Sequence, residues 1–294
     1  MQMRTDLALE AKEIAGDLVE GVEYTTKNYK NMVVSTMKIV TIEASNRLNK
    51  DIGTYITIEL PPLTDEFTQN DERLKIIAKK IKSLLPRKGL VLVAGLGNLE
   101  ITPDALGPKS ASQILATRHI KGEFAKSIGL DILRPVAVIS PGVLGQTGIE
   151  TGELILSVVE KVKPSAVIAI DALASRRLER LGCTIQISDT GISPGAGVAN
   201  NRFIINEQTV GVPVISIGVP TVVDAVTLAT DLLNVNADAN FKIPENIVCP
   251  NGQKMVVTPS EIDLLISRGA KLISMSTNCA LQPEFELADL LSLV

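Results

Sequence analysis

The sequence predicts an α/β fold, in which a largely parallel β-sheet carries helices on both faces. Hydrophobic residues make up 45% of the 294 residues, but aromatic residues only 3%, and Trp is absent. The core must therefore be built from Val, Ile, Leu and Ala, which suits strands that are buried on both faces. From residue 90 onward, short apolar runs also alternate with helical stretches, which is typical of βαβ units.

The first elements are expected before this alternation begins. An amphipathic pattern predicts a helix over about 6–19, and residues 33–43 and 53–60 read as strands. Residues 71–85 place their apolar side chains on one helical face, and Pro86 ends that helix.

The alternating part supplies the remaining elements. Strands are expected at 90–94, 135–139, 166–170, 184–187 and 213–217. Helices are expected at 108–128, 150–162, 221–233 and 259–268. Residues 235–258 read as polar and irregular, and the chain is interpreted as one domain with an excursion near 235–250.

Composition excludes several classes of function. The net charge is −4 without a Lys/Arg block, which disfavours direct binding of nucleic acid. The apolar stretches are too short to cross a membrane, and the N-terminus lacks the apolar region of a signal peptide. Three scattered Cys, at 183, 249 and 279, indicate reduced thiols in a cytoplasmic protein.

The loop after the 90–94 strand presents the first candidate catalytic residue. Gly95 and Gly97 allow a tight turn, and Asp104 follows. A dinucleotide-binding turn would need Gly where Glu100 stands, and a Walker Lys is absent. The simpler interpretation of Asp104 is a helix cap.

The second candidate, Asp171, directly follows the apolar run 166–170. In open α/β sheets, ligands bind beyond the carboxyl ends of strands. Asp171 could instead cap a helix or pair with Arg176 or Arg177. Together, Asp104 and Asp171 could share one proton, so that one activates a water while the other polarises a scissile carbonyl.

Other catalytic arrangements are disfavoured. Residues 191–195 fit the G-x-S-x-G elbow, but the oxyanion hole needs an N–H that Pro194 lacks. The only His, His119, lies in a stretch read as helical, precedes this Ser, and is interpreted as a surface or packing residue. With one His and scattered Cys, we expect no metal site and no cofactor.

Three further features keep simple alternatives. Glu150 and Glu153 are typical of the first turn of a helix but could line a peptide groove. The Gly-rich segment 189–202 is either a surface turn or part of the site. Asp224 is best interpreted as a helix cap.

Several long motifs resemble the spore germination protease family over nearly the whole chain. They are GLGN…TPDALGP, PGVLGQTGIET, IDALASR, TIQISDTGI, GVPVISIGVPTVVDA and the opening RTDLALEA. The resemblance implies an α/β three-layer sandwich with a mostly parallel or mixed sheet, related to the hydrogenase maturation proteases. It also implies an atypical aspartic endopeptidase without a cofactor, whose catalytic aspartates match Asp104 and Asp171.

The resemblance further implies partners and a location. Such enzymes degrade small acid-soluble spore proteins in the spore core when germination begins, and are homotetramers made as zymogens. This chain departs from the family pattern at PGAGVANNR, and at Gln282 within NCALQP, where a His is common. Gln282 therefore argues against a role for a C-terminal His.

The N-terminus resembles the sites that this family cuts, where Thr-Glu precedes Phe or Ile and then Ala. Thr5-Asp6-Leu7-Ala8 follows the same order, so the resemblance predicts self-cleavage between Asp6 and Leu7. Residues 1–6 would then be a propeptide and 7–294 a single catalytic domain. Alternatively, this segment only starts a helix, with Thr5 or Asp6 as N-cap.

Two other functions remain open at this level. A metal-dependent maturation peptidase, like the hydrogenase relatives, would need a third ligand that only His119 could supply. A non-catalytic α/β binding domain would use its aspartates merely to cap helices.

Overall fold

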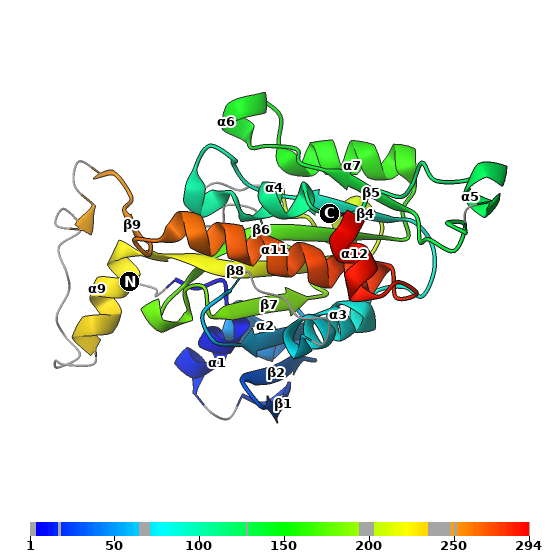
Figure 1. Ribbon diagram of the computed structural model, residues 1–294. Helices are drawn as coiled ribbons and strands as arrows, with labels where there is room; N and C mark the ends of the chain where they lie inside the picture. Colours follow the sequence, from blue (N-terminus) through cyan, green and yellow to red (C-terminus); the bar gives the residue numbers. More distant parts are fainter. Residues whose placement is uncertain are drawn as a thin grey trace.

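The computed structural model describes residues 4–16, 19–64, 71–127, 129–193, 203–234, 248–249 and 252–293 (Figure 1). Its strands form one mixed sheet in the order β1-β2-β3-β7-β8-β6-β4-β5, with β9 paired to β8. The parallel half consists of β5, β4, β6 and β8, and each adjacent pair of these strands is parallel. β1, β2, β3 and β7 form an antiparallel half, which joins the parallel half where β7 meets β8. A predicted α/β fold with a mixed sheet is thereby confirmed.

The strands have the following bounds: β1 Val22–Tyr29, β2 Met32–Ile39, β3 Gly53–Glu59, β4 Val91–Gly95, β5 Val136–Ile139, β6 Ala166–Ser175, β7 Thr184–Ser188, β8 Val214–Asp224 and β9 Val256–Val257. The shorter helical pieces are η1 Thr102–Asp104, α5 Glu123–Ser127, α6 Leu144–Thr147, η2 Leu178–Arg180, α9 Ala225–Asn234 and α12 Leu287–Leu293.

Alternate residues of the strands point to opposite faces of the sheet, and each face packs against a layer of helices. On the first face, buried residues such as Ile168, Ile187 and Ile217 pack against α3 (Glu72–Leu84), α4 (Leu106–Ala111) and α11 (Ile262–Leu281). Figure 1 shows α11 and α3 lying across the sheet on this side.

The second face is covered in two separate places. Beside β4 and β6, Val167 and Ala169 pack against α7 (Thr151–Val162) and α8 (Glu207–Val210). Beside β2 and β3, Met37 and Tyr55 pack against α1 (Ala8–Ala15) and α2 (Ile42–Leu48). Between these two apolar clusters lie the middle strands, and this gap positions the site.

The helix predicted over 108–128 is wrong. α4 ends at Ala111, and α5 covers only Glu123–Ser127. Between them, Leu115 N–H donates to Asn278 Oδ1 of α11, and Arg118 N–H donates to Val136 O of β5. These tertiary hydrogen bonds satisfy the backbone without a helix, so helix propensity does not decide this segment.

Two other helices differ from the prediction. Residues 221–224 continue β8 instead of starting a helix, because the β-branched Thr221, Val222 and Val223 extend its pairing with β6 and β9. The helix expected at 259–268 runs on to Leu281, because Gly269 is buried against Leu63 and Leu106 and does not interrupt it.

The N-terminal part holds elements that the sequence did not predict. β1 pairs with β2 in a regular antiparallel register, and α2 starts at Ile42, where the predicted 33–43 strand has already ended. α1 is shorter than predicted because Gly16, with φ of 96°, ends it after Ala15. Within the described residues, no helix is both long and apolar enough to cross a bilayer.

Candidate active site

The gap on the second face of the sheet is a cavity of about 2060 Å³. Its floor is made by polar residues of the middle strands: Asp171 of β6, Gln186 and Ser188 of β7, and Ser216 of β8. They stand at positions that alternate with the isoleucines packed on the opposite face. The Ser188 and Ser216 hydroxyls lie 2.8 Å apart across the two strands. The alternation that directs isoleucines into the core therefore directs this row of polar side chains toward the cavity.

Asp171 lies within β6 and not at its end, so the predicted strand-end position is wrong. β6 continues to Ser175 because its pairing with β8 persists as far as Ser175 and Val223. Asp171 is 6% exposed, and its Oδ1 accepts from Ala172 N–H at 2.9 Å.

The pairing of Asp171 with nearby arginines was one alternative. Arg176 contacts Glu13 and Asp231 at 3.5 Å each, and Arg177 contacts Glu179 at 3.1 Å. Both guanidinium groups therefore contact carboxylates other than Asp171.

Asp104 is the last residue of η1, the first helical element after β4. Its Oδ2 accepts from Asn98 N–H at 2.7 Å, which folds the loop back on itself. Gly97, with φ of 112°, makes this fold possible, because a Cβ there would lie 2.1 Å from Asp104 O. A Cβ at Gly107 would likewise lie 2.1 Å from Leu96 O and 2.4 Å from Ile170 O. The glycine therefore lets α4 pack directly over β4 and β6.

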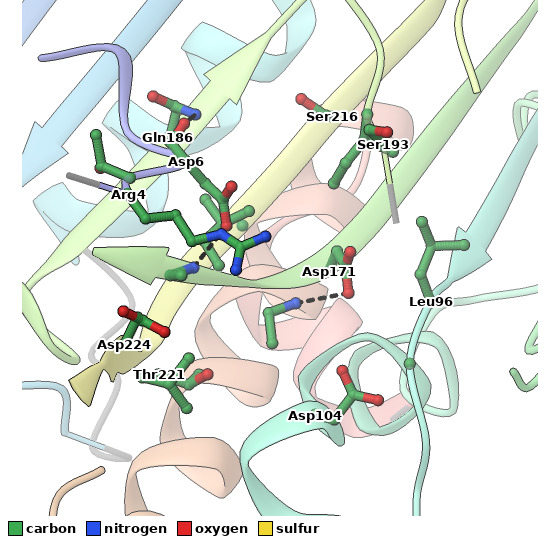
Figure 2. Close-up of a pocket in the computed structure, with 18 of the residues that line it drawn as sticks. Arg4, Asp6, Leu96, Asp104, Asp171, Gln186, Ser193, Ser216, Thr221 and Asp224 are labelled. Atoms are coloured by element: carbon green, nitrogen blue, oxygen red, sulfur yellow. Dashed lines mark hydrogen bonds between the residues drawn. The ribbon is translucent and has the colours of Figure 1, made fainter. Parts of the chain in front are cut away.

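The structure brings Asp104 and Asp171 to the same cavity. β4 and β6 are adjacent parallel strands, with Gly95 opposite Ile170, so the loop that leaves β4 starts beside Asp171, which is still within β6. Both carboxyl groups line the cavity, and Figure 2 shows them facing the same space. Two carboxyl groups that line one space can act as an acid and a base toward the same substrate.

The N-terminal segment occupies the other side of this cavity. Arg4, Thr5 and Asp6 line it, and Figure 2 shows the Arg4 side chain pointing toward Asp171. Asp6 N–H donates to Ala174 O at 2.9 Å, and Ala174 N–H donates to Asp6 Oδ2 at 2.7 Å. The segment is thus bound to β6 three residues beyond Asp171.

Two polar residues that the sequence did not single out hold this segment. Gln186 Nε2 donates to Asp6 O at 3.0 Å, and its Oε1 accepts from Ala8 N–H at 2.6 Å. Lys50 Nζ donates to Asp6 O at 2.9 Å. Burial lowers the pKa of the Lys50 ammonium, an effect that the Asp6 carboxylate partly offsets. A polar residue inside the alternating run TIQIS was the signal available for Gln186, whereas Lys50 stands in an ordinary polar turn.

A family model described as Germination protease matches residues 2–238. The chain belongs to the germination protease family. It is 46% identical to a germination protease of Caldanaerobacter subterraneus, covering 96% of this chain and 94% of the relative. It is 45% identical to one of Clostridium tetani, with coverages of 99% and 98%. It is 35% identical to one of Priestia megaterium, with coverages of 97% and 95%. The resemblance inferred from the sequence motifs is confirmed.

Membership in the germination protease family gives the chain a peptidase role in spore germination. Among solved structures, a [NiFe] hydrogenase maturation protease HycI from Thermococcus kodakarensis is 16% identical, with a TM-score of 0.37. That alignment covers 67% of this chain and 98% of the other.

Three other features considered in the sequence have structural positions near the cavity. Asp224 Oδ1 accepts from Thr227 N–H at 2.9 Å, so it caps α9 as predicted. Glu150 immediately precedes α7 and Glu153 lies in its first turn, while Thr151 lines the cavity. Of the segment 189–202, residues 190–193 line the cavity, and 194–202 lie outside the described residues.

His119 and Gln282 lie on other parts of the fold. His119 is exposed in a turn, so the helical setting predicted for it is wrong, while its surface position is confirmed. Gln282 is buried, and its side chain binds Arg134 N–H and Arg134 O at 2.9 Å each, which fixes the end of α11.

Metal-binding donors are dispersed across the described part of the chain. Within it, no three His, Cys, Asp or Glu side chains are grouped so that they could hold a metal ion. Cys183, Cys249 and Cys279 are free thiols, and burial raises the pKa of Cys183 and Cys279.

Proposed function

We propose that this germination protease is an aspartic endopeptidase in which Asp104 and Asp171 form the catalytic pair. The observation that carries the proposal is that both carboxyl groups line one cavity, Asp171 from β6 and Asp104 from the loop that follows the adjacent parallel strand β4. The cavity is also lined by a chain segment, Arg4 to Asp6, so its shape accommodates a peptide.

In the proposed reaction the pair starts with one shared proton. The ionised carboxylate takes a proton from a water, whose oxygen bonds to the scissile carbonyl carbon. The protonated partner donates to the carbonyl oxygen, which gives a tetrahedral gem-diol. When the C–N bond breaks, one carboxyl protonates the departing nitrogen and the other takes a hydroxyl proton, so the pair regains its single proton. Its titration belongs to the pair and has two apparent pKa values.

The finer biological role is also part of the proposal. The substrates are small acid-soluble spore proteins, degraded in the spore core, and the enzyme works as a homotetramer. The motifs around Asp104 and Asp171, and the relatives that match along almost the whole chain, support this role.

We also propose that the chain is a zymogen that cuts itself between Asp6 and Leu7. Thr5 and Asp6 already line the cavity, while Leu7 and Ala8 are 0% exposed. Asp6 is bound at Ala174, which is about 10 Å along an extended strand from Asp171. Cleavage therefore requires this segment to leave its position first, whether the same chain or a second copy then attacks it.

Substitution of each aspartate tests the catalytic pair. Asp104→Asn and Asp171→Asn should each lower kcat/KM on a small acid-soluble spore protein about a thousandfold or more, with the far-UV spectrum unchanged. Asp189→Asn is the matched control, since Asp189 Oδ1 accepts from Thr54 N–H at 2.6 Å and an Asn oxygen can do the same. Near-normal activity of either catalytic variant would refute the pair.

Self-cleavage is tested by mass spectrometry of the intact chain after incubation. The wild type should lose residues 1–6 and start at Leu7, whereas Asp171→Asn alone should remain intact. Tagged Asp171→Asn mixed with wild type separates attack by a second copy from attack within one chain, because only the former cuts the tagged protein. A new terminus elsewhere would refute the proposed site.

A further inference from the structure

We propose that the main chain of Ala174, with Lys50 and Gln186, forms a subsite that binds an acidic residue of an extended peptide substrate. In the intact chain, Asp6 fills this subsite. The proposal rests on the peptidase function proposed above, but it concerns residues that stand apart from Asp104 and Asp171.

The first component is an edge of β6 that extends past its neighbour. The pairing of β4 with β6 ends at Gly95 and Ile170, whereas β6 continues to Ser175. At Ala174, both main-chain polar groups are directed at Asp6: its O accepts from Asp6 N–H, and its N–H donates to the Asp6 carboxylate. A peptide can therefore add to this edge as a strand does, with an acidic side chain closing the contact.

Gln186 is the second component, and it holds the peptide main chain on both sides of one residue. Its amide nitrogen donates to Asp6 O at 3.0 Å and its amide oxygen accepts from Ala8 N–H at 2.6 Å. Gln186 is only 7% exposed, so its amide is committed to whatever chain lies there. A buried amide that satisfies two main-chain groups holds a peptide without contacting its side chains.

The third component, Lys50, supplies positive charge. α2 ends at Leu48, and its C-cap Asn49, with a left-handed φ of 50°, turns the chain so that Lys50 lines the cavity. Its Nζ donates to Asp6 O at 2.9 Å and to Thr5 O at 3.3 Å. The Asp6 carboxylate also raises the pKa of Lys50 against the larger lowering by burial, so the two charges interact. An ammonium in this partly desolvated place favours an acidic occupant over its amide analogue.

Hydrogen exchange of the full-length chain tests the subsite without any catalysis. Amides of the peptide that covers residues 4–8 should be protected in the wild type. Lys50→Met and Gln186→Leu should each speed their exchange about tenfold or more, since each removes hydrogen bonds to this segment. Lys88→Met and Gln208→Leu are matched controls at exposed positions and should leave it unchanged. An unprotected segment in the wild type would refute the subsite.

Competition with short peptides tests the selectivity for acid. Acetyl-Arg-Thr-Asp-amide, added to the full-length wild type, should displace the segment and speed its exchange at about a tenfold lower concentration than acetyl-Arg-Thr-Asn-amide. In Lys50→Met this difference between the two peptides should shrink, which a purely structural role of Lys50 would not produce. Equal potency of the two peptides on the wild type would overturn the acid preference.

These outcomes are separable from failure of the proposed function. If Gln186→Leu does not fold, as judged by its thermal unfolding, Lys50→Met and the peptide pair still decide the question. Protection and acid-selective displacement in a protein that cleaves nothing would retain the subsite and refute the peptidase mechanism. Cleavage that depends on Asp104 and Asp171, together with an unprotected segment, would retain the peptidase mechanism and refute the subsite.

Discussion

Two regions with carboxylates adjoin the same strand, β6, and they use their charges in different ways. In the middle of β6, Asp171 faces the cavity together with Asp104. Just beyond its end, Glu10 of α1 is 0% exposed and accepts from Arg176 N–H at 2.7 Å and Arg177 N–H at 3.1 Å. Arg180 lies 3.3 Å from the same carboxylate.

The difference shows what separates a structural carboxylate from a candidate catalytic one. Glu10 is enclosed, and main-chain N–H groups and a guanidinium fix its position, so its charge fastens α1 to the turn after β6. Arg180 extends this network to Glu13 at 2.6 Å and Glu59 at 3.1 Å. Asp104 and Asp171 also accept main-chain N–H groups, but they line the cavity, where a substrate and a water can approach them.

The sharpest test of this comparison is the double variant Asp104→Asn/Asp171→Asn. If the two carboxyl groups act as one unit, the double variant should lose about as much kcat/KM as either single variant, about a thousandfold or more. Steady-state kinetics of all four proteins, with circular dichroism to verify folding, measure this. Multiplicative losses would show two independent roles and would contradict a shared proton.

Glu10→Gln should behave in the opposite way. It leaves an amide N–H₂ facing main-chain donors and removes a charge from a buried ion pair, so the free energy of unfolding should fall by about 3 kcal/mol. Urea unfolding measures the loss, and kcat/KM per folded molecule should stay close to the wild-type value. Glu123→Gln is the control, because its pair with Lys126 is exposed and should contribute little. Unchanged stability would show that Glu10 is not a structural anchor.

Gly97→Ala should lower both the free energy of unfolding and kcat/KM, because Gly97 supports the loop that carries Asp104. The new Cβ would lie 2.1 Å from Asp104 O at a φ of 112°, so we expect about 1–3 kcal/mol of destabilisation and a loss of activity as Asp104 moves. Gly129→Ala separates strain from the clash, since Gly129 has φ of 72° with nothing within 4 Å of its Cβ. Equal kinetics for the two variants would contradict a role of Gly97 in placing Asp104.

Lys50 gives a smaller effect that depends on pH. Its folded pKa lies below 10.5, so between the two values the unfolded chain binds more protons and the Lys50 contribution to stability rises with pH. The stability of wild type minus that of Lys50→Met should therefore increase as the pH rises toward 10.5. Tyr55, whose pKa burial raises to about 12, is present in both proteins and cancels in the difference. A flat difference curve would contradict the burial of this ammonium.

The smallest expected effect concerns metal removal. Because metal-binding donors are dispersed within the described residues, dialysis against a chelator should leave kcat/KM unchanged. Loss of activity that one divalent ion restores, with the fold intact throughout, would favour a metal-dependent peptidase instead.

The sequence by itself determined most of the parallel half and the two candidate aspartates. The apolar runs near 90–94 and 166–170 are strands, because residues buried on both faces leave a continuous hydrophobic signal. The glycines around Asp104 also signalled a tight loop, since such close backbone contacts tolerate no Cβ. Long motifs connected these residues to a family, which the comparisons confirm.

Tertiary structure alone decided which residues meet around those aspartates. Asp6, Lys50 and Gln186 come from three distant segments, and their hydrogen bonds exist only because β7 lies beside β3 and β8 in the sheet. Local pattern also failed at 108–128, where hydrogen bonds to α11 and to β5 replace a helix. Periodicity records which face of an element is buried, but it contains no information about which element supplies the neighbouring surface. The strand order supplies it, and it places a lysine and a glutamine where a peptide can lie beside two carboxyl groups.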